Sequence, residues 1–500
     1  MLSENTKLKY FFEPSVVAVV GASRNPSKPG HVILSNFLEN KKRGLFKGKV
    51  YPINPNADEI LGVKCYSSLL DLPEKPNLCI IVVPAAVVPK VLEDAGKIDC
   101  PAAVIISAGF SEVGNKELEN KVLDIAKKYG IRIIGPNCLG ILNMYTGVDT
   151  LFLPPNKPIE PGVEVEAAPR PPQGFVSFLT QSGAFGVSSL DYFSGEGIGI
   201  RIFVSYGNRI DVDDADLLAY LADDEKTRAI MLYIESLKNG RKFMEIASQV
   251  TLKKPIVAFK AGRTRAGAKA ALSHTASLAG RDEIYDAAFK QCGVIRAYTM
   301  NEFFIIGKAL VSQPPAKGPN VAIVTDGGGA GVMAADACEL RGLKVGELGK
   351  DTKELFEKYK DEGVFPKFAV TNNPIDLTGS ATTDMYIKAI EAVLKDPLVD
   401  SVIVLALHHV PGIQYLKSFV HEIADVVRKV NKDKKPVVVA DIGSSEGARY
   451  IREEFDKNYI PSYSSPEDAA VAIAALTRYG KYLAKKGVFE KHLSEWKPIY

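Results

Sequence analysis

The chain of 500 residues contains few of the residues that mark several large classes of protein. Its six cysteines form no CxxC pair, which predicts buried, reduced thiols rather than a structural zinc site or a disulfide framework. Sixty-two Lys and Arg against 59 Asp and Glu leave a formal charge of +3, too small for a basic nucleic-acid-binding surface. No apolar run approaches the ~20 residues that span a bilayer, and the polar first ten residues contain no signal-peptide apolar region. We therefore expect a cytoplasmic protein with no nucleic-acid and no membrane partner.

The hydrophobic pattern predicts the α/β class. At roughly 150 residues a domain, the chain is long enough for about three domains. Short runs rich in valine and isoleucine recur, each followed by a helical pattern, as is typical of a parallel sheet buried on both faces. In the first third these runs lie at residues 16–20, 50–53, 78–83, 103–107 and 131–134. Their spacing predicts one doubly wound domain over residues 1–150.

Two proline-rich segments divide the rest of the chain. Residues 154–173 carry seven prolines and no helix or strand period, so we expect an exposed linker or long loop over 151–173. Further apolar runs predict a second open sheet in a domain over 174–313, and the segment 314–320 then breaks the chain again. The remaining runs predict a third domain over 318–500. These later runs lie at residues 175–179, 200–204, 229–234, 255–259, 321–324, 401–407 and 436–440.

Two hydroxyl residues mark expected helix starts. Thr299 stands three residues before Glu302, and Ser465 stands three residues before Asp468. This spacing is typical of a capped helix N-terminus. We expect the last helices of the second and third domains to begin there.

Three expected strands continue directly into turns of small residues that open helices. They are VVGAS (19–23), FLTQSGAFG (178–186) and VTDGGGAGVMAADA (324–337). Small side chains let a ligand approach free backbone N–H groups, and the helix dipole favours an anion there. Tight packing of helix on strand is the alternative explanation for any single turn. With three such turns, we expect at least one genuine phosphate site.

The first turn does not fit a dinucleotide site. It reads GASRNPSKPGH rather than GxGxxG, and the next strand ends at Ile53 before Asn54, Pro55 and Asn56, with no acidic residue for a ribose. Nicotinamide binding is therefore disfavoured. A nucleotide whose phosphates meet Arg24 and Lys28 remains compatible with the turn.

His274 has unusual neighbours for a core histidine. The segment 260–283 around it consists largely of Gly, Ala, Ser and Thr and holds three Arg and two Lys. Cations and hydroxyl groups suit an imidazole that handles phosphate, and positive surroundings keep it neutral and nucleophilic. The alternative is a surface histidine in a loop.

Two further polar positions end expected strands. Glu235 follows an apolar strand at the ligand-bearing edge of an open sheet, where a carboxylate can orient a histidine. His408 and His409 are expected to end another strand and to contact substrate or phosphate. Because adjacent side chains on a strand face opposite ways, we do not expect them to share a metal ion.

The motifs taken together resemble a known family. GASRNPSKPGH, GPNCLGI (135–141), LTQSGAFG, SYGNRIDVDDAD (205–216), YIES, the His274 segment, TDGGGAG and NPIDLTGSATTDMY (373–386) look like the α subunit of ADP-forming acyl-CoA synthetases, relatives of succinyl-CoA synthetase. The match covers about 15–480, with the motifs in family order. The resemblance implies a Rossmann-like CoA-binding domain followed by two flavodoxin-like domains. It also implies reversible conversion of acyl-CoA, ADP and phosphate to free acid, CoA and ATP, with Mg²⁺ accompanying the nucleotide.

The resemblance also implies roles for particular residues. His274 would accept the phosphoryl group from an acyl phosphate and pass it to ADP, and Glu235 would orient this histidine. The helix starts that would hold the phosphoryl group comprise Gln181, Ser182, Gly183, Ala184, Gly327, Gly328, Gly329 and Ala330. The residues that would bind CoA comprise Gly21, Ala22, Ser23, Arg24, Lys28, Asn54, Pro55, Asn56, Val83, Pro84, Ala85, Ser107, Ala108, Gly109 and Asn137. Relatives place a lysine near Asn56 that this chain lacks, so we expect Lys28 to supply part of the phosphate contact.

The family's ATP-grasp domain, which binds ADP, has no counterpart in the 500 residues. The resemblance therefore implies an ATP-grasp β subunit and an α₂β₂ assembly. The alternatives are a CoA-binding sensor without catalytic activity and the CoA-binding part of a protein acetyltransferase. The acid would be a small carboxylic acid, and acetate, branched, aryl and hydroxy acids would be distinguished by side chains at 143–153 and 206–209.

Overall fold

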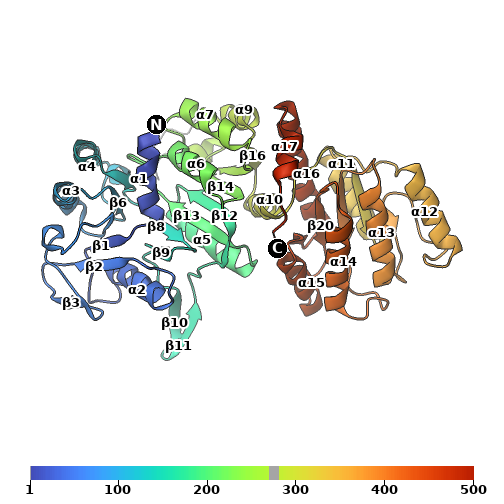
Figure 1. The fold of residues 1–500 in the computed structure, drawn as a ribbon, viewed down its shortest axis with the longest axis horizontal. Coiled ribbons are helices and arrows are strands. Elements are labelled where there is room, and N and C mark those ends of the chain that lie inside the picture. The colour runs from blue at the N-terminus through green and yellow to red at the C-terminus, as the bar shows by residue number, and fades with distance from the viewer. Residues whose placement is uncertain (1, 270–280, 500) are drawn as a thin grey trace. The chain divides into compact units, whose positions relative to one another are not determined.

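A computed structural model describes residues 2–269 and 281–499 of the chain (Figure 1). It divides the protein into two compact units, Met1–Arg296 and Ala297–Tyr500, which are described separately below. The α/β class and the parallel sheets expected from the sequence are confirmed.

The first unit begins with a five-stranded parallel sheet in the order β2-β1-β5-β6-β7. All five residues of its inner strand β1 are buried because helices cover both faces of the sheet. The strands are β1 (Val16–Val20), β2 (Lys49–Ile53), β5 (Leu78–Ile81), β6 (Ala102–Ile105) and β7 (Arg132–Ile134). The helices are α1 (Leu2–Phe12), α2 (Pro29–Lys42), α3 (Val88–Lys97) and α4 (Lys116–Tyr129). Short elements β3 (Glu59–Ile60), β4 (Val63–Lys64), η1 (Leu69–Asp71), η2 (Ala85–Val87) and η3 (Ser111–Val113) lie in the connections.

A second sheet in the same unit has the order β16-β15-β14-β12-β13-β8-β9. The strands are β8 (Gly140–Asn143), β9 (Val148–Asp149), β12 (Gln173–Thr180), β13 (Ile200–Ser205), β14 (Ala229–Ile234), β15 (Ile256–Lys260) and β16 (Ile295–Ala297). The described helices around it are α5 (Gly183–Gly195), α6 (Asp214–Asp223), α7 (Gly240–Val250) and α9 (Asp282–Cys292).

The sheets do not follow the expected boundary at residue 150. Strands β8 and β9 precede that residue, yet β8 pairs with β13 in antiparallel register, from Ile202 opposite Asn143 to Ser205 opposite Gly140. The two sheets also share one hydrophobic core, in which Phe12 of α1 stacks on Tyr220 of α6 with ring centroids 4.7 Å apart. The first expected domain and the one after it thus form a single packed unit.

The proline-rich segment differs from the expected linker without strands. It forms an antiparallel hairpin of β10 (Asn156–Glu160) and β11 (Val163–Glu166), which projects from the first unit in Figure 1. Every residue of both strands is exposed, as expected for the segment. The hairpin forms because Gly162, at φ +84°, allows the tight reversal after Pro161.

The second unit contains a five-stranded parallel sheet in the order β18-β17-β19-β20-β21. Its strands are β17 (Val321–Thr325), β18 (Ile375–Asp376), β19 (Ser401–Leu405), β20 (Val437–Ala440) and β21 (Ser462–Tyr463). Its helices are α10 (Met300–Ser312), α11 (Gly328–Leu340), α12 (Lys350–Asp361), α13 (Thr383–Lys395), α14 (Leu416–Val430), α15 (Glu446–Lys457), α16 (Pro466–Lys485) and α17 (Phe489–Glu495). Helix α10, expected with the domain before it, packs against α16 in this unit.

The local sequence signals are confirmed. Thr299 caps α10 by accepting a hydrogen bond from the Glu302 N–H at 3.1 Å, and Ser465 caps α16 through the Asp468 N–H at 3.1 Å. All six cysteines are buried. Among the described helices, none has the length and apolar character needed to cross a membrane.

Candidate active site

The turn after β1 lies at the switch point of the first sheet, between the carboxyl ends of β1 and β5. Open α/β sheets bind ligands at such a crevice. Gly21 has φ +92°, and a Cβ atom there would lie 2.3 Å from the Val82 carbonyl oxygen, so only glycine fits. A Cβ atom on Gly30 would lie 2.1 Å from the Gly21 oxygen. The first turn of α2 therefore lies directly on this turn, and Lys28 at its N-cap position makes no side-chain cap.

Hydrogen bonds connect the turn at Gly21 to the neighbouring turns. The Asn54 side-chain amide donates to the Ala22 carbonyl oxygen at 2.8 Å, and its oxygen accepts from the Asn56 N–H at 2.9 Å. Asn54 therefore shapes the turn around Gly21. Arg24 donates to the Glu59 carbonyl oxygen at 3.2 Å, although the residue itself is exposed.

A cavity of about 800 Å³ opens between the carboxyl edges of the first two sheets. Several residues expected at ligand sites line it, namely Val83, Ser107, Ala108, Asn137, Gln181, Gly183 and Ala184. Others expected to bind CoA do not line it: Gly21, Ala22, Ser23, Arg24, Lys28, Asn54, Pro55, Asn56, Pro84, Ala85 and Gly109. The described structure thus brings one part of the expected CoA set to the cavity and leaves the rest in the turns after β1, β2, β5 and β6, outside the cavity lining.

Sequence reasoning missed several side chains of the cavity, among them Lys116, Glu119 and Asn120 of α4 and Lys238 of the turn after β14. Phe152, Leu153, Asn208 and Arg209 also line the cavity and fall in the ranges 143–153 and 206–209, where the side chains that distinguish the acids were expected.

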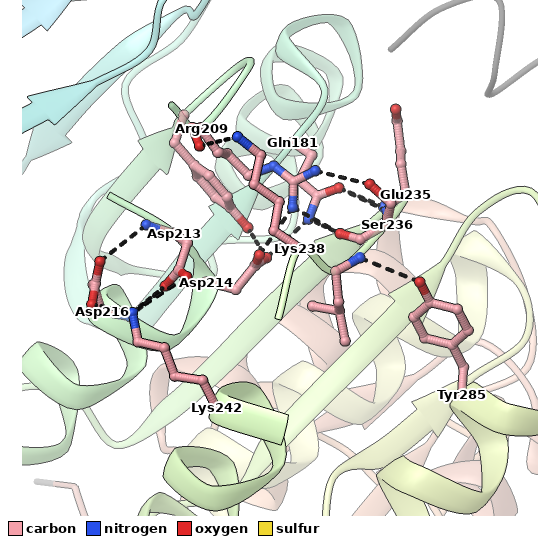
Figure 2. Close-up of polar contacts among 12 residues, drawn as sticks. Gln181, Arg209, Asp213, Asp214, Asp216, Glu235, Ser236, Lys238, Lys242 and Tyr285 are labelled. Atoms are coloured by element: carbon pink, nitrogen blue, oxygen red, sulfur yellow. Dashed lines mark hydrogen bonds and ion pairs between the residues drawn. The ribbon is translucent and has the colours of Figure 1, made fainter. Parts of the chain in front are cut away.

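Glu235 lies at the end of β14, where a buried hydrogen-bond network fixes its backbone (Figure 2). The Gln181 side-chain oxygen accepts from the Glu235 N–H at 2.8 Å and from the Ser236 N–H at 3.1 Å. The Gln181 amide nitrogen donates to Asp214 and to the Ser236 carbonyl oxygen, each at 2.9 Å. In Figure 2 the Glu235 side chain extends away from this network. The network holds the main chain and leaves the carboxyl group outside it.

The N-terminus of α5 begins two residues after Gln181. The Ser182 hydroxyl caps the helix by accepting from the Phe185 N–H at 3.3 Å. At Gly183 an added Cβ atom would meet only the Leu139 Cβ at 3.7 Å and the Ser205 hydroxyl oxygen at 4.0 Å. Open space at the start of a helix is the geometry in which an anion meets backbone N–H groups.

His274 lies outside the described residues. The strand β15 before its segment ends at Lys260, which is only 1% exposed. The Lys260 ammonium donates to the Ala261 carbonyl oxygen and lies 4.6 Å from the centre of the Tyr285 ring. Burial lowers the pKa of Lys260, while the carboxylates of Asp282 and Glu235 act in the opposite direction.

The third small-residue turn belongs to the second unit. Gly327 is the N-cap residue of α11 and provides no side-chain cap. A Cβ atom on Gly328 would lie 2.8 Å from the Asp376 carboxylate, whereas one on Gly329 would meet nothing within 4 Å. Asp326, just before the turn, is 4% exposed. Burial raises the pKa of Asp326 to about 7, and Asp441 and Asp376 contribute in the same direction.

His408 and His409 do not have the expected placement. Strand β19 ends at Leu405, so both histidines lie beyond the strand and its alternation does not apply. Their rings lie side by side with centroids 4.0 Å apart. His408 Nδ1 lies 2.7 Å from the Asp441 carboxylate, and Nε2 lies 3.3 Å from the Ser445 hydroxyl. Within 2–269 and 281–499, no group of three His, Cys, Asp or Glu side chains is arranged to hold a metal ion.

Three family models match the sequence in the order of the sheets. A CoA binding domain matches residues 15–144, a succinyl-CoA ligase like flavodoxin domain matches 173–310, and a ligase-CoA domain matches 321–485. This combination defines the succinyl-CoA ligase-like class of proteins.

Relatives of established activity narrow the class. The acetate–CoA ligase (ADP-forming) I subunit alpha of Pyrococcus furiosus is 41% identical over 490 residues, which are 96% of this chain and 99% of that protein. The acetate–CoA ligase (ADP-forming) of Methanocaldococcus jannaschii is 41% identical over 493 residues. That match covers 97% of this chain but 65% of the longer relative.

A solved structure agrees with both. It is the dinucleotide-forming acetyl-coenzyme A synthetase 1 of Ca. Korarchaeum cryptofilum in complex with phosphate and ADP. It is 39% identical, covers 96% of this chain and 98% of its own, and superimposes with a TM-score of 0.86. The chain belongs to the family of α subunits of ADP-forming acetyl-CoA synthetases. It is a ligase subunit, and the full-length matches favour this assignment over a CoA sensor or a fragment of an acetyltransferase.

Proposed function

We propose that this chain forms the acyl phosphate and carries the phosphoryl group on His274, while a partner subunit binds ADP. The observation that carries the proposal is the network in Figure 2, because one side chain, Gln181, joins the start of α5 to the backbone of Glu235 at the edge of the cavity. An anion-binding helix start and a carboxylate are thereby held together. Phosphoryl transfer depends mainly on such positioning and on charge stabilisation.

In the proposed reaction, a phosphate oxygen attacks the thioester carbonyl and CoA leaves as the thiolate, which gives an acyl phosphate. An imidazole nitrogen of His274 then attacks the phosphorus, and the free acid leaves as its carboxylate. The Glu235 carboxylate accepts a hydrogen bond from the other imidazole nitrogen and so fixes the attacking tautomer. The phosphohistidine finally transfers its phosphoryl group to ADP.

Three groups of residues bind the reactants in this proposal. CoA occupies the crevice at Gly21 and Gly30 and extends into the cavity past Val83 and Ser107. The backbone N–H groups of Gly183 and Ala184 face the phosphoryl group, and the start of α11 at 328–330 in the second unit is the other expected anion-binding helix start. The N–H groups of Ser182 and Gly327 instead donate to Thr180 Oγ1 at 3.1 Å and to Thr325 Oγ1 at 3.0 Å. Gln181 has a positioning role in this scheme, because its side chain is engaged with Glu235, Ser236 and Asp214 and its N–H donates to the Tyr233 carbonyl oxygen.

The partner is proposed to be an ATP-grasp β subunit in an α₂β₂ assembly. Support comes from the P. furiosus relative, which is named a subunit and has the length of this chain, and from the M. jannaschii relative, which is about half as long again. Mg²⁺ accompanies ADP and ATP and would be held mainly by the partner. Acetate is the proposed acid, as in the names of these relatives.

The deciding experiment is labelling of the full chain with ³²P-phosphate and acetyl-CoA. We expect an acid-labile, base-stable phosphate on His274, and we expect His274→Ala to abolish it while the Kd for CoA stays within about twofold. A wild-type chain that takes up no label would contradict the proposal, as would CoA affinity lost together with the label. ATP synthesis at full rate by the isolated chain would contradict the need for a partner.

A further inference from the structure

Arg209 has two local features that are costly in a folded protein. Its φ is +56°, in the left-handed region that residues other than glycine rarely adopt. The side chain is 4% exposed, and its Nε atom is buried with no hydrogen-bond partner among the described residues. An unsatisfied buried donor destabilises the folded state by about 1–3 kcal/mol. Features of this kind persist where surrounding contacts and function require them.

Both Nη atoms of the Arg209 guanidinium donate hydrogen bonds, to the start of α6 and to Ser236 after β14. Nη1 donates to the Asp214 carboxylate at 3.1 Å and to the Ser236 carbonyl oxygen at 2.8 Å. Nη2 donates to the Ser236 hydroxyl at 2.9 Å. Arg209 thus connects the turn after β13 to the residue that follows Glu235.

The Asp214 carboxylate links Arg209 to Gln181, because it accepts hydrogen bonds from both side chains. Its Oδ1 accepts from the Tyr206 hydroxyl at 2.6 Å and from the Gln181 amide at 2.9 Å. With Gln181 bound to the Glu235 and Ser236 N–H groups, the contacts form a closed ring that joins the ends of β12, β13 and β14 (Figure 2). All members of the ring are buried.

A contribution to folding stability does not explain the ring well. A buried ion pair gains little net stability, because desolvation of both charges offsets their attraction, and apolar residues of similar volume often stabilise as well. Hydrogen bonds to charged groups do, however, restrict geometry. The ring fixes the two elements on which the proposed phosphoryl transfer depends, the start of α5 and the backbone of Glu235.

We infer that Arg209, paired with Asp214, is a positioning residue for phosphoryl transfer. It acts through Ser236 and Gln181 to hold Glu235 within hydrogen-bond reach of His274, and it contacts no transferred atom itself. The inference rests on the proposed function. It predicts that loss of Arg209 slows the chemical step and leaves CoA binding intact, because a displacement of about 1 Å at the reacting groups can lower a rate by about 100-fold.

The test compares Arg209→Met, Glu235→Gln and the double variant in ³²P labelling of His274 by acetyl-CoA and phosphate. We expect Arg209→Met to slow labelling at least about tenfold, with a Kd for CoA within about twofold of wild type. Because both residues act through Glu235, the double variant should be about as slow as Glu235→Gln alone. The inference would be overturned if Arg209→Met were labelled at the wild-type rate. It would also be overturned if the rate reduction in the double variant equalled the product of the two single-variant reductions.

Two further variants guard against misfolding. Ser236→Ala removes only the Nη2 contact, and Arg209→Lys keeps the charge without the two-pronged geometry. Each should slow labelling by at least about threefold, and wild-type rates in both would overturn the inference. Lys242→Met is the matched control, because it removes the nearby ion pair with Asp216 (2.7 Å) outside the ring and should label normally. A wild-type chain that takes up no label would instead refute the proposed function.

Discussion

The side-chain oxygen of Gln181 lies 2.8 Å from the backbone nitrogen of Glu235, across 54 residues of sequence. This bond fixes the position of the turn before α5 relative to the end of β14. The bond also changes the role expected for Gln181 from its motif. Its side chain orients the main chain near the reacting groups, and its own N–H donates to the Tyr233 carbonyl oxygen at 3.3 Å, so neither is directed at an anion.

The carboxyl group of Glu235 is predicted to matter for chemistry rather than for folding. Glu235→Gln keeps the backbone bonds to Gln181, because they involve only the Glu235 main chain. We expect His274 phosphorylation to fall by about 100-fold, the scale of general acid–base and orienting effects. The thermal midpoint measured by calorimetry should change by less than about 2 °C. Phosphorylation at the wild-type rate would remove Glu235 from the mechanism.

Two glycines are predicted to respond oppositely to alanine. At Gly21 the new Cβ atom would collide with the Val82 oxygen, so Gly21→Ala should destabilise the first unit and abolish CoA binding. At Gly183 the folded chain has room for a Cβ atom, so stability should remain. Because a helical Cβ points toward the N-terminus, it should obstruct the anion and reduce His274 phosphorylation by at least about tenfold. Equal stability loss in both variants, measured by circular dichroism, would contradict this distinction.

Loss of the buried ion pair between Arg201 and Asp224 is predicted to lower the free energy of unfolding more than loss of the exposed pair between Asp223 and Lys253. Their side chains are 5% and 11% exposed and 2.9 Å apart. Burial alone would raise the pKa of Asp224, but hydrogen bonds from Arg201 and Thr227 hold it below its ordinary value. Asp224→Ala should lower the free energy of unfolding by about 3 kcal/mol, since it leaves Arg201 buried without this partner.

The matched control for that variant is the adjacent residue. Asp223 pairs with Lys253 at 2.9 Å, with both side chains more than half exposed. Asp223→Ala should therefore change the free energy of unfolding by less than about 1 kcal/mol. Urea denaturation of the two variants in parallel measures the difference, and similar losses would contradict the assignment.

Asp326 is predicted to make the second unit less stable as pH rises. Its pKa is raised to about 7, so the folded state holds a proton that the unfolded state loses near pH 4. The folded state then binds more protons between these values, and stability falls across that window. Each unit of the rise corresponds to about 1.4 kcal/mol. Asp326→Asn should remove this dependence, so the variant gains stability relative to wild type between pH 5 and pH 8.

Fluorescence of the single Trp496, which is half-buried in the second unit, can follow urea denaturation at both pH values. The quantity to compare is the difference in free energy of unfolding between Asp326→Asn and wild type at each pH, because the contributions of all other titrating groups cancel in this difference. A difference that does not vary with pH would show that Asp326 is ionised in the folded chain across this range.

The sequence was sufficient for the features that depend on local spacing. Buried valine and isoleucine runs predict the parallel strands, and hydroxyl caps such as Thr299 and Ser465 predict helix starts. The position of Glu235 at a strand end follows from the same pattern. These features are readable because period and capping act within a few residues.

Features that depend on distant contacts could not be read in this way. Asn208 donates to Glu119 across 89 residues and to Glu112 across 96, so their common cavity is set by packing of the two sheets. The side-chain partners of Arg209 are Asp214 at the start of α6 and Ser236 after the end of β14, which lies 27 residues further along the chain. The placement of His408 and His409 was wrong because β19 ends earlier than its apolar run.

Because β8 pairs with β13 in antiparallel register, the first two domains share a β-sheet and are not connected by a flexible linker alone. A rigid-body rotation of one domain relative to the other would have to break the buried ladder of hydrogen bonds between β8 and β13. Excising the leading domain at residue 150 would therefore remove an edge from its neighbour and expose that ladder. Exchanges between related synthetases should preserve Met1–Arg296 as one piece.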